Sequence, residues 1–357
     1  MPILSADELT AFSQALLAAH GVHADEAQIV ASGLVGANLR GHDSHGVLRI
    51  PQYLEALAAG RIKTAAPLEI LDESPGLLAA DAGWGLGQVQ AHRLLDRLIP
   101  KAKTLGVCAG TLRRCGHTGR LGEYAERAAG EGLALIGTVN SHGSGNRVAP
   151  PGGTEGRLST NPLCIGVPTP NAPLVLDIGT SVCAEGKVRV AFQKGERVPE
   201  NWLLDSDGRP TTDPGVLYKE PSGTILPLGG PQAYKGFGLS LLLDALAGGL
   251  SGGACSKGDP APATGNTVLF ILFDTGRFAG SEHFLKVVGN LADYVRGCPT
   301  SAGVDRILLP GDPERLSLEK RKLEGIHISD GLWQTLTGLA KTCAVAIPKE
   351  YMKVARP

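Results

Sequence analysis

The sequence is poor in aromatic residues, has no excess of charge of either sign and contains no long apolar run. Aromatic residues make up 4% of the 357 residues, and 34 Lys and Arg balance 35 Asp and Glu. The chain therefore lacks the base-stacking surfaces and the basic field that nucleic-acid binding needs, and we expect no nucleic acid as a partner. The most apolar stretch, residues 239–250, contains Asp244 and two glycines. Because it is much shorter than the roughly 20 residues of a membrane-spanning helix, we expect no membrane contact.

The seven cysteines are odd in number, scattered along the chain and without any CxxC pair. Such usage is typical of reduced thiols, so we expect a cytoplasmic protein. The first ten residues are acidic and lack the basic segment of a secretory signal. Glycine, in contrast, is abundant: its 49 residues are about twice the average share of roughly 7%. They form short clusters without a period, which favours an enzyme whose sites are built from loops.

Apolar periodicity predicts helices at both ends of the chain and alternating strands and helices between them. Ser5 and Glu8 form a capping box at the start of the first helix, and Pro51 requires the third helix to begin shortly before it. The predicted helices span residues 6–20, 24–39, 45–57, 88–105, 119–129, 234–249, 282–295, 313–323 and 331–339. The predicted strands span residues 68–71, 77–80, 107–112, 133–139, 174–178 and 267–273. The alternation indicates an α/β fold, and the irregular residues 184–230 are expected to cover a site or contact another subunit.

The densest polar cluster is Arg40-Gly41-His42-Asp43-Ser44-His45-Gly46, followed by Arg49 and Tyr53. If a helix begins at residue 45, His45, Arg49 and Tyr53 lie on one of its faces. A guanidinium can bind a carboxylate with two hydrogen bonds, and an imidazole can exchange a hydroxyl proton near neutral pH. This pair suits a 2-hydroxy or 2-oxo acid. The alternative is a helix start with solvated polar residues.

The same residues allow a different chemistry. His42, Asp43 and His45, joined by His117 or His142, could hold the zinc ion of a hydrolase. The spacing is weakly specific, and the chain has neither an HExxH motif nor a cysteine ligand set. We therefore predict no metal site and keep the zinc-dependent hydrolase as the alternative from another class.

A second polar cluster, residues 113–119, lies where a strand ends and a helix begins, which is where α/β folds place ligand-binding groups. It contains His117, which is flanked by Gly116 and Gly119. No dinucleotide fingerprint is present, because Gly83, Gly85 and Gly87 have the wrong spacing and no GxGxxG motif follows a strand. A Rossmann domain is therefore disfavoured, although a nicotinamide cofactor is not.

Read together, several segments resemble the type 2 malate/L-lactate dehydrogenases. That family includes ureidoglycolate and sulfolactate dehydrogenases, diketogulonate reductase and piperideine-2-carboxylate reductase. The segments follow the family's order and cover nearly the whole chain: GHDSHGVLRIPQY (41–53), GHTGRLGEYAERAAGEGLALIG (116–137), STNPLCIGVP (159–168), DIGTS (177–181), YKGFGLSLLLDALAGGLSG (234–252) and LPGDPER (309–315).

The resemblance implies a three-layer α/β/α fold with a mixed sheet, a non-Rossmann NAD(P)-binding fold with a large irregular insert, and helical segments at both ends. It implies residues 1–75 with 300–357 as a helical region for substrate and dimer contacts. Residues 76–299 then form the NAD(P)-binding region, with the insert at about 184–230. It further implies hydride transfer between NAD or NADP and a small 2-hydroxy or 2-oxo acid, malate- or lactate-like, in a homodimer with a shared active site. Of the two cofactors we favour NAD. The alternative within enzymes is reduction of a cyclic imino acid or a keto sugar acid.

Residue roles follow from the resemblance position by position. Ser44 and His45 match a relay and proton-transfer pair, and His117 matches a proton acceptor. Substrate contacts are assigned to Arg49, which binds the carboxylate, Thr160 and Tyr53. Cofactor contacts are assigned to Asp177, Gly179, Thr180, Ser181, Lys235, Gly236, Pro310, Gly311 and Arg315.

The sequence departs from the family's pattern in three respects. Thr118 replaces the usual Phe, which is expected to change one wall of the pocket. Asn140 and Ser141 stand near the lysine of the ureidoglycolate branch, which argues against that activity. Lys187 replaces an Asp of the imino-acid reductases, which disfavours imine reduction.

Overall fold

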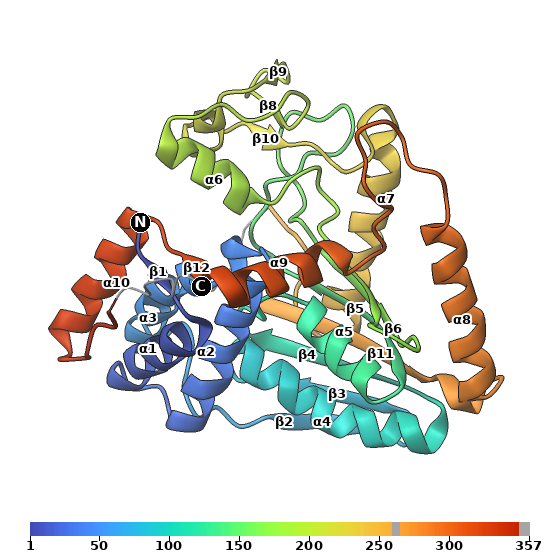
Figure 1. The fold of residues 1–357 in the computed structure, drawn as a ribbon. Coiled ribbons are helices and arrows are strands. Elements are labelled where there is room, and N and C mark those ends of the chain that lie inside the picture. Colours follow the sequence, from blue (N-terminus) through green and yellow to red (C-terminus); the bar gives the residue numbers. More distant parts are fainter. Residues whose placement is uncertain (259–264, 350–357) are drawn as a thin grey trace, which may run out of the picture.

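The computed structural model describes residues 1–258 and 265–349, and its centre is a seven-stranded mixed sheet (Figure 1). Only β3 and β4 run parallel, joined through α4, and every other neighbouring pair is antiparallel. The order across the sheet is β2 (Glu69–Glu73), β3 (Leu77–Asp81), β4 (Val107–Cys115), β11 (Asn266–Asp274), β5 (Leu133–Asn140), β6 (Leu163–Val167) and β7 (Leu174–Ile178). The mixed α/β architecture that the sequence predicts is confirmed.

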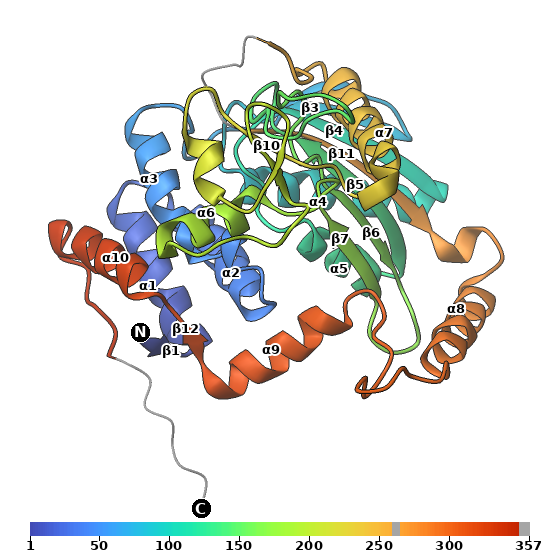
Figure 2. The ribbon, with the colours of Figure 1, turned by 90° about the horizontal axis from the view of Figure 1, so that it is seen from above.

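Helices cover both faces of this sheet (Figure 2). Helices α4 (Gly87–Leu105) and α5 (Gly122–Gly130) pack on one face, and α7 (Ala233–Asp244), continued by a π turn at Ala245–Gly249, lies on the other. The first face has a large apolar core, in which the rings of Tyr124 and Phe270 lie 5.3 Å apart. Gly137 leaves the space that this Phe270 ring fills, since a Cβ there would lie 3.0 Å from the ring.

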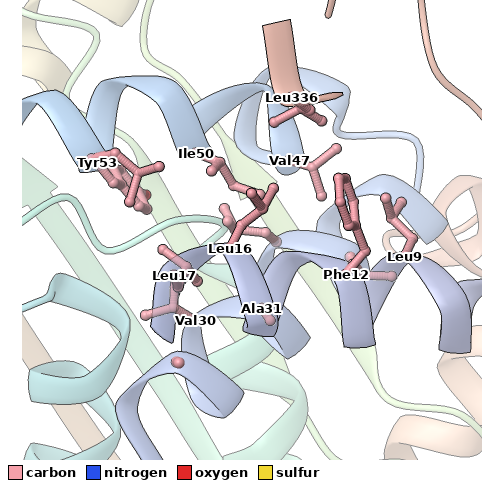
Figure 3. Packing of buried hydrophobic residues seen from close by; sticks show 14 of the residues in the cluster. Leu9, Phe12, Leu16, Leu17, Val30, Ala31, Val47, Ile50, Tyr53 and Leu336 are labelled. Carbon is pink, nitrogen blue, oxygen red and sulfur yellow. The ribbon is translucent and has the colours of Figure 1, made fainter. Parts of the chain in front are cut away.

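A second apolar core joins the two ends of the chain (Figure 3). The helices that build it are α1 (Ala6–Ala19), α2 (Ala24–Leu39), α3 (Ile50–Ala58) and α10 (Asp330–Thr342). The predicted capping box is confirmed, because Glu8 N donates to Ser5 Oγ at 3.2 Å and Ser5 N donates to Glu8 Oε2 at 3.1 Å. Strands β1 (Ile3–Leu4) and β12 (Ile326–His327) pair antiparallel and fasten the C-terminal helix to the N-terminal ones.

The third helix begins at Ile50, so the prediction of a helix from residue 45 is wrong. Two 3₁₀ turns, Asp43–His45 and Val47–Arg49, precede it. The cause is the Asn38 side chain, which donates to Asp43 Oδ1 at 2.6 Å and accepts from Val47 N at 2.9 Å. Asn38 takes the space beside Gly46, where a Cβ would lie 2.2 Å from its Oδ1. Pro51 lies in the first turn of α3, as expected.

The insert is more ordered than its sequence predicts. It contains α6 (Glu185–Lys194) and a three-stranded antiparallel sheet in the order β10 (Thr224–Ile225), β8 (Leu203–Leu204), β9 (Pro210–Thr211). These elements pack around a small apolar cluster of their own that includes Val148, Leu203 and Ile225. Helix α6 gives little periodic signal, because Val188 is its only buried residue.

Two smaller differences concern the sheet and α5. Strand β6 was not predicted, because Pro162 and Gly166 make its sequence look like a turn. Helix α5 begins at Gly122 rather than 119, which leaves residues 117–121 as a turn between β4 and α5.

The remaining long helices are α8 (Ser281–Arg296) and α9 (Asp312–Glu324). Among the described residues, no helix is both long enough and apolar enough to cross a bilayer.

Candidate active site

The turn before α3 holds Ser44, His45 and Arg49 close together. Ser44 Oγ and His45 Nδ1 share a hydrogen bond of 3.0 Å. Arg49 Nε donates to the backbone oxygen of Ser44 at 2.7 Å, and Arg49 Nη1 donates to Gln52 at 2.8 Å. The insert lies against this turn, because a Cβ on Gly186 of α6 would lie only 2.9 Å from Ser44 Cβ. Helix α6 therefore covers the turn from the side of the insert.

The second histidine is positioned by a close approach between two backbones. His117 follows β4, and its turn packs against the first residue of α4, Gly87. A Cβ on Gly87 would lie 2.3 Å from the backbone oxygens of Gly116 and His117, so only glycine fits there. Gly87, one of the three glycines whose spacing does not match a dinucleotide fingerprint, thus positions this turn.

The two histidines face each other across the junction of the sheet and the N-terminal helices. Their rings are stacked with centroids 5.5 Å apart and planes inclined by 24°. Tyr53 of α3 is hydrogen-bonded to His117 Nδ1 at 2.7 Å. The structure thus brings His45, Arg49, Tyr53 and His117 into one site, although not through the single helical face that the sequence predicts.

Tyr53 is hydrogen-bonded on two sides. Gln88 Nε2 donates to the Tyr53 oxygen at 3.1 Å. The direction of the bond between Tyr53 and His117 Nδ1 follows the tautomer of His117. A phenol that donates to Nδ1 leaves a neutral His117 with its own proton on Nε2, as a donor. Sequence reasoning missed Gln88, which it took for an ordinary helix-start residue; the only available signal was its place directly after Gly87.

Burial keeps both histidines neutral. Burial, together with the positive charge of Arg49, lowers the pKa of His45 from 6.5 to about 3. The same two causes, in the same order, lower the pKa of His117 well below 6.5. Burial raises the pKa of Tyr53 to about 12, although Arg49 opposes that shift. The site therefore contains two uncharged imidazoles and a protonated phenol beside one guanidinium.

A small cavity of about 20 Å³, enough for one water molecule, lies beside His117 and Tyr53. Its lining includes Gln52, Leu86 and Gln88. Thr118 does not line this cavity. Its backbone N and Oγ1 both donate to Asn266 Oδ1, at 2.9 and 3.2 Å, so the side chain points into the sheet.

The five candidate zinc ligands do not converge. His42 Nε2 lies 3.2 Å from Glu314, and the carboxylate of Asp43 is bound by Arg321 at 2.6 and 2.9 Å. His142 packs against the ring of Trp84 instead of His45. Within residues 1–258 and 265–349, no group of three His, Cys, Asp or Glu side chains is arranged to hold a metal ion. This geometry gives the zinc hydrolase alternative no support.

Most of the predicted cofactor residues lie around β7. Asp177 Oδ2 accepts from Gly122 N at the start of α5 at 2.7 Å, and burial raises the pKa of Asp177. Thr180 Oγ1 donates to the backbone oxygen of Thr160 at 3.0 Å, and Ser181 Oγ donates to the backbone oxygen of Cys183 at 2.7 Å. Gly179, which lies between Asp177 and Thr180 in the sequence, is exposed.

The other predicted cofactor residues approach β7 from two sides. Gly236 packs on the backbone of Leu228, whose N donates to Thr180 O at 2.9 Å. The neighbouring Lys235 is exposed, with Nζ 6.0 Å from the centroid of the Tyr234 ring.

On the other side, Pro310 O accepts from Val175 N at 3.1 Å, and Gly311 packs against the backbone of β7. Arg315 Nη1 donates to Pro173 O at 2.9 Å. The predicted cofactor residues are thus brought together around one strand by contacts within the chain.

The remaining family departures lie outside the cavity. Asn140 is buried in β5 and donates to Asp244 at 2.6 Å. Lys187 is exposed on α6. Neither side chain contacts the two histidines.

Comparison with known proteins agrees with this geometry. The family model described as malate/L-lactate dehydrogenase matches residues 4–337. L-lactate dehydrogenase of Cupriavidus necator is 35% identical over 337 residues, which cover 93% of this chain and 95% of that protein. The structure of malate dehydrogenase from Pyrococcus horikoshii superimposes with a TM-score of 0.86 at 32% identity, covering 96% of both chains. Δ1-piperideine-2-carboxylate reductase from Pseudomonas syringae superimposes with a TM-score of 0.82 at 30% identity, covering 95% of this chain and 100% of that one. The chain belongs to the malate/L-lactate dehydrogenase family of oxidoreductases.

Proposed function

We propose that the protein transfers a hydride between NAD(P) and a small 2-hydroxy or 2-oxo acid of the malate or lactate type. One observation carries the proposal: two half-buried imidazoles, each with a lowered pKa, face each other beside the guanidinium of Arg49. A carboxylate held by Arg49 puts the adjacent carbon and its oxygen next to groups that can move a proton.

We assign the proton-transfer role to His45 and a hydrogen-bonding role to His117. In the oxidising direction, Arg49 binds the substrate carboxylate, and His45 takes the hydroxyl proton on Nε2 while its Nδ1–H donates to Ser44 Oγ. His117 already has its proton on Nε2 and donates a hydrogen bond to the reacting oxygen. Tyr53 holds the ring of His117 in that orientation, and Thr160 contributes to the substrate side.

The cofactor role goes to the residues around β7, namely Asp177, Gly179, Thr180, Ser181, Lys235, Gly236, Pro310, Gly311 and Arg315. Bound NAD(P) would supply the nicotinamide carbon that accepts the hydride from C2 of the substrate. Of the two dinucleotides we favour NAD. His42 lies in the turn that carries His45, and its side chain is hydrogen-bonded to Glu314 of α9. The proposed cofactor surface therefore lies next to that turn.

The second candidate is reduction of a cyclic imino acid. It is favoured by the similarity to the piperideine-2-carboxylate reductase and opposed by Lys187, which is an exposed residue of α6 here. Both candidates use Arg49 for a carboxylate, so the choice between them depends on the substrate assay.

We further propose a cytoplasmic homodimer. Helix α7, its π turn and the residue after that turn expose Leu242, Leu246 and Leu250 at fractions of 64%, 44% and 60%. Their spacing of four residues places them in one apolar stripe, and an exposed stripe of this kind marks an interaction surface. A second copy of the chain is its proposed occupant.

The function is tested by following absorbance at 340 nm with NADH or NADPH and a panel of 2-oxo acids. Oxaloacetate or pyruvate should oxidise the cofactor, whereas acetaldehyde should not, because it has no carboxylate for Arg49. Turnover of a cyclic imino acid alone would favour the second candidate. An enzyme that turns over none of these compounds would contradict both.

Replacing Arg49 by Lys should lower kcat/KM for the 2-oxo acid by roughly 10- to 100-fold, because the charge remains but the forked hydrogen bonds are lost. Binding of the cofactor, measured by quenching of protein fluorescence, should stay nearly unchanged. Arg97→Lys, in the surface pair with Glu73, is the matched control and should behave as the wild type. Our assignment of the carboxylate would be wrong if Arg49→Lys abolished cofactor binding and spared the substrate KM.

Replacing His45 by Asn should lower kcat by roughly 10²- to 10⁴-fold, because it removes the base. Since burial lowers the pKa of His45 to about 3, this base stays unprotonated in mild acid. The acidic limb of kcat/KM for hydroxy-acid oxidation should therefore lie well below pH 6.5 in the wild type. It should be lost in His45→Asn.

His117→Asn is the comparison variant, and it should mainly raise KM while keeping the acidic limb. The opposite pattern, with His45→Asn nearly normal and His117→Asn inactive, would exchange the two roles.

Replacing Leu242 by Glu should convert the dimer into a monomer, because it places a charge in the apolar stripe. Light scattering after gel filtration measures the mass. Leu77→Glu is the control, since Leu77 is 59% exposed on β3, away from the stripe. A wild type that elutes as a monomer at all concentrations would exclude this interface.

A further inference from the structure

One buried arginine has hydrogen-bond donors without acceptors. The side chain of Arg120, in the turn between β4 and α5, is only 2% exposed. Its Nη2 donates to Glu126 at 2.8 Å, but Nε and Nη1 have no partner. Buried charged donors that lack an acceptor are costly, and native structures rarely keep them without a reason. An acceptor that the chain does not supply is therefore expected at these atoms.

Arg120 lies across the first turn of α5. A Cβ on Gly122 would lie 2.1 Å from Arg120 Nη1 and 3.3 Å from Asp177 Oδ2, so glycine at 122 makes room for the guanidinium. The positive charge of Arg120 is near enough to contribute to the lowered pKa of His45 and to oppose the raised pKa of Asp177. Arg120 thus stands between the turn that carries His45 and the end of β7.

The carboxylates near Arg120 leave two of its nitrogens without an acceptor. Glu126 is shared, because Arg40 also binds it through Nε at 3.0 Å and Nη2 at 2.7 Å. Asp177 and Glu314 also lie near enough to interact with the charge of Arg120, but neither accepts a hydrogen bond from Nε or Nη1. Asp177 does not pair with Arg120 in the described structure; its Oδ2 is taken by Gly122 N.

We propose that Arg120 binds an anionic oxygen of the reactants through the nitrogens that now lack partners. This inference rests on the proposed function, and the oxygen has two possible sources. It belongs either to the diphosphate of the dinucleotide or to a second acid group of the substrate, such as the distal carboxylate of a dicarboxylic acid. In both cases Arg120 is a binding residue in addition to Arg49.

The test compares Arg120→Met, which removes the donors, with Arg40→Met, which removes the other arginine on Glu126 and leaves Arg120 in place. Calorimetry measures the binding of ADP-ribose, which has the diphosphate and lacks nicotinamide. Kinetics measure the ratio of kcat/KM for oxaloacetate to that for pyruvate, two 2-oxo acids that differ by a carboxylate. Thermal unfolding monitors folding, and Arg120→Lys is a second variant in case Arg120→Met does not fold.

A contact with the diphosphate predicts that Arg120→Met weakens ADP-ribose binding by roughly 10- to 100-fold and leaves the oxaloacetate-to-pyruvate ratio unchanged. A contact with a second acid group predicts unchanged ADP-ribose binding and a similar fall in that ratio. Arg120→Lys should show part of the same loss, and Arg40→Met should stay within about twofold of the wild type in both measurements.

The proposal is overturned if Arg120 variants change neither measurement, since internal water would then satisfy the guanidinium. It is also overturned if Arg40→Met produces the same losses, because the effect would then come from Glu126. A wild type that turns over no 2-oxo acid contradicts the proposed function, whereas an active wild type with unaffected Arg120 variants contradicts only this inference.

Discussion

The hydrogen bond between Tyr53 and His117 joins the two apolar cores on which the rest of the structure depends. Tyr53 belongs to the cluster of the terminal helices, and the His117 turn leaves β4 beside the cluster of the sheet. The candidate site lies where these two cores meet. Because the core of the terminal helices is close-packed, Tyr53 is held in place, and it is hydrogen-bonded to His117, whose ring is stacked on that of His45.

Burial at that junction also sets the chemistry. An exposed pair of histidines would be partly protonated near neutral pH, and a second positive charge beside Arg49 would repel the guanidinium. Here burial and Arg49 both favour the neutral rings, so the histidines add no positive charge beside the guanidinium. A carboxylate is then attracted to Arg49, while the proton-transfer groups stay ready to accept or donate.

The sequence predicts much of this arrangement, and its errors have identifiable causes. Residue types and their order were enough to select His45, Arg49 and His117, and periodicity was enough to predict most helices and strands. The helix expected from residue 45 does not form, because the backbone N of Val47 donates to the side chain of Asn38, nine residues earlier in the sequence. Local periodicity carries no information about such a contact. The hydrogen-bond partner of Thr118, Asn266, is likewise 148 residues away and is not indicated by local sequence.

The proposed direction of proton transfer rests on distant contacts as well. From the sequence, both histidines can be argued as the base, and His45 is favoured because it lies close to Arg49 and beside the hydroxyl of Ser44. The structure adds a contact that the sequence does not reveal: Tyr53 is hydrogen-bonded both to Gln88, at the start of α4, and to His117 Nδ1. A ring that already accepts on Nδ1 carries its proton on Nε2 and acts as a donor. His45 Nδ1 is bonded to the hydroxyl of Ser44, which can accept a hydrogen bond as readily as donate one. When Nδ1 carries the proton and donates to Ser44 Oγ, Nε2 is free to act as the base.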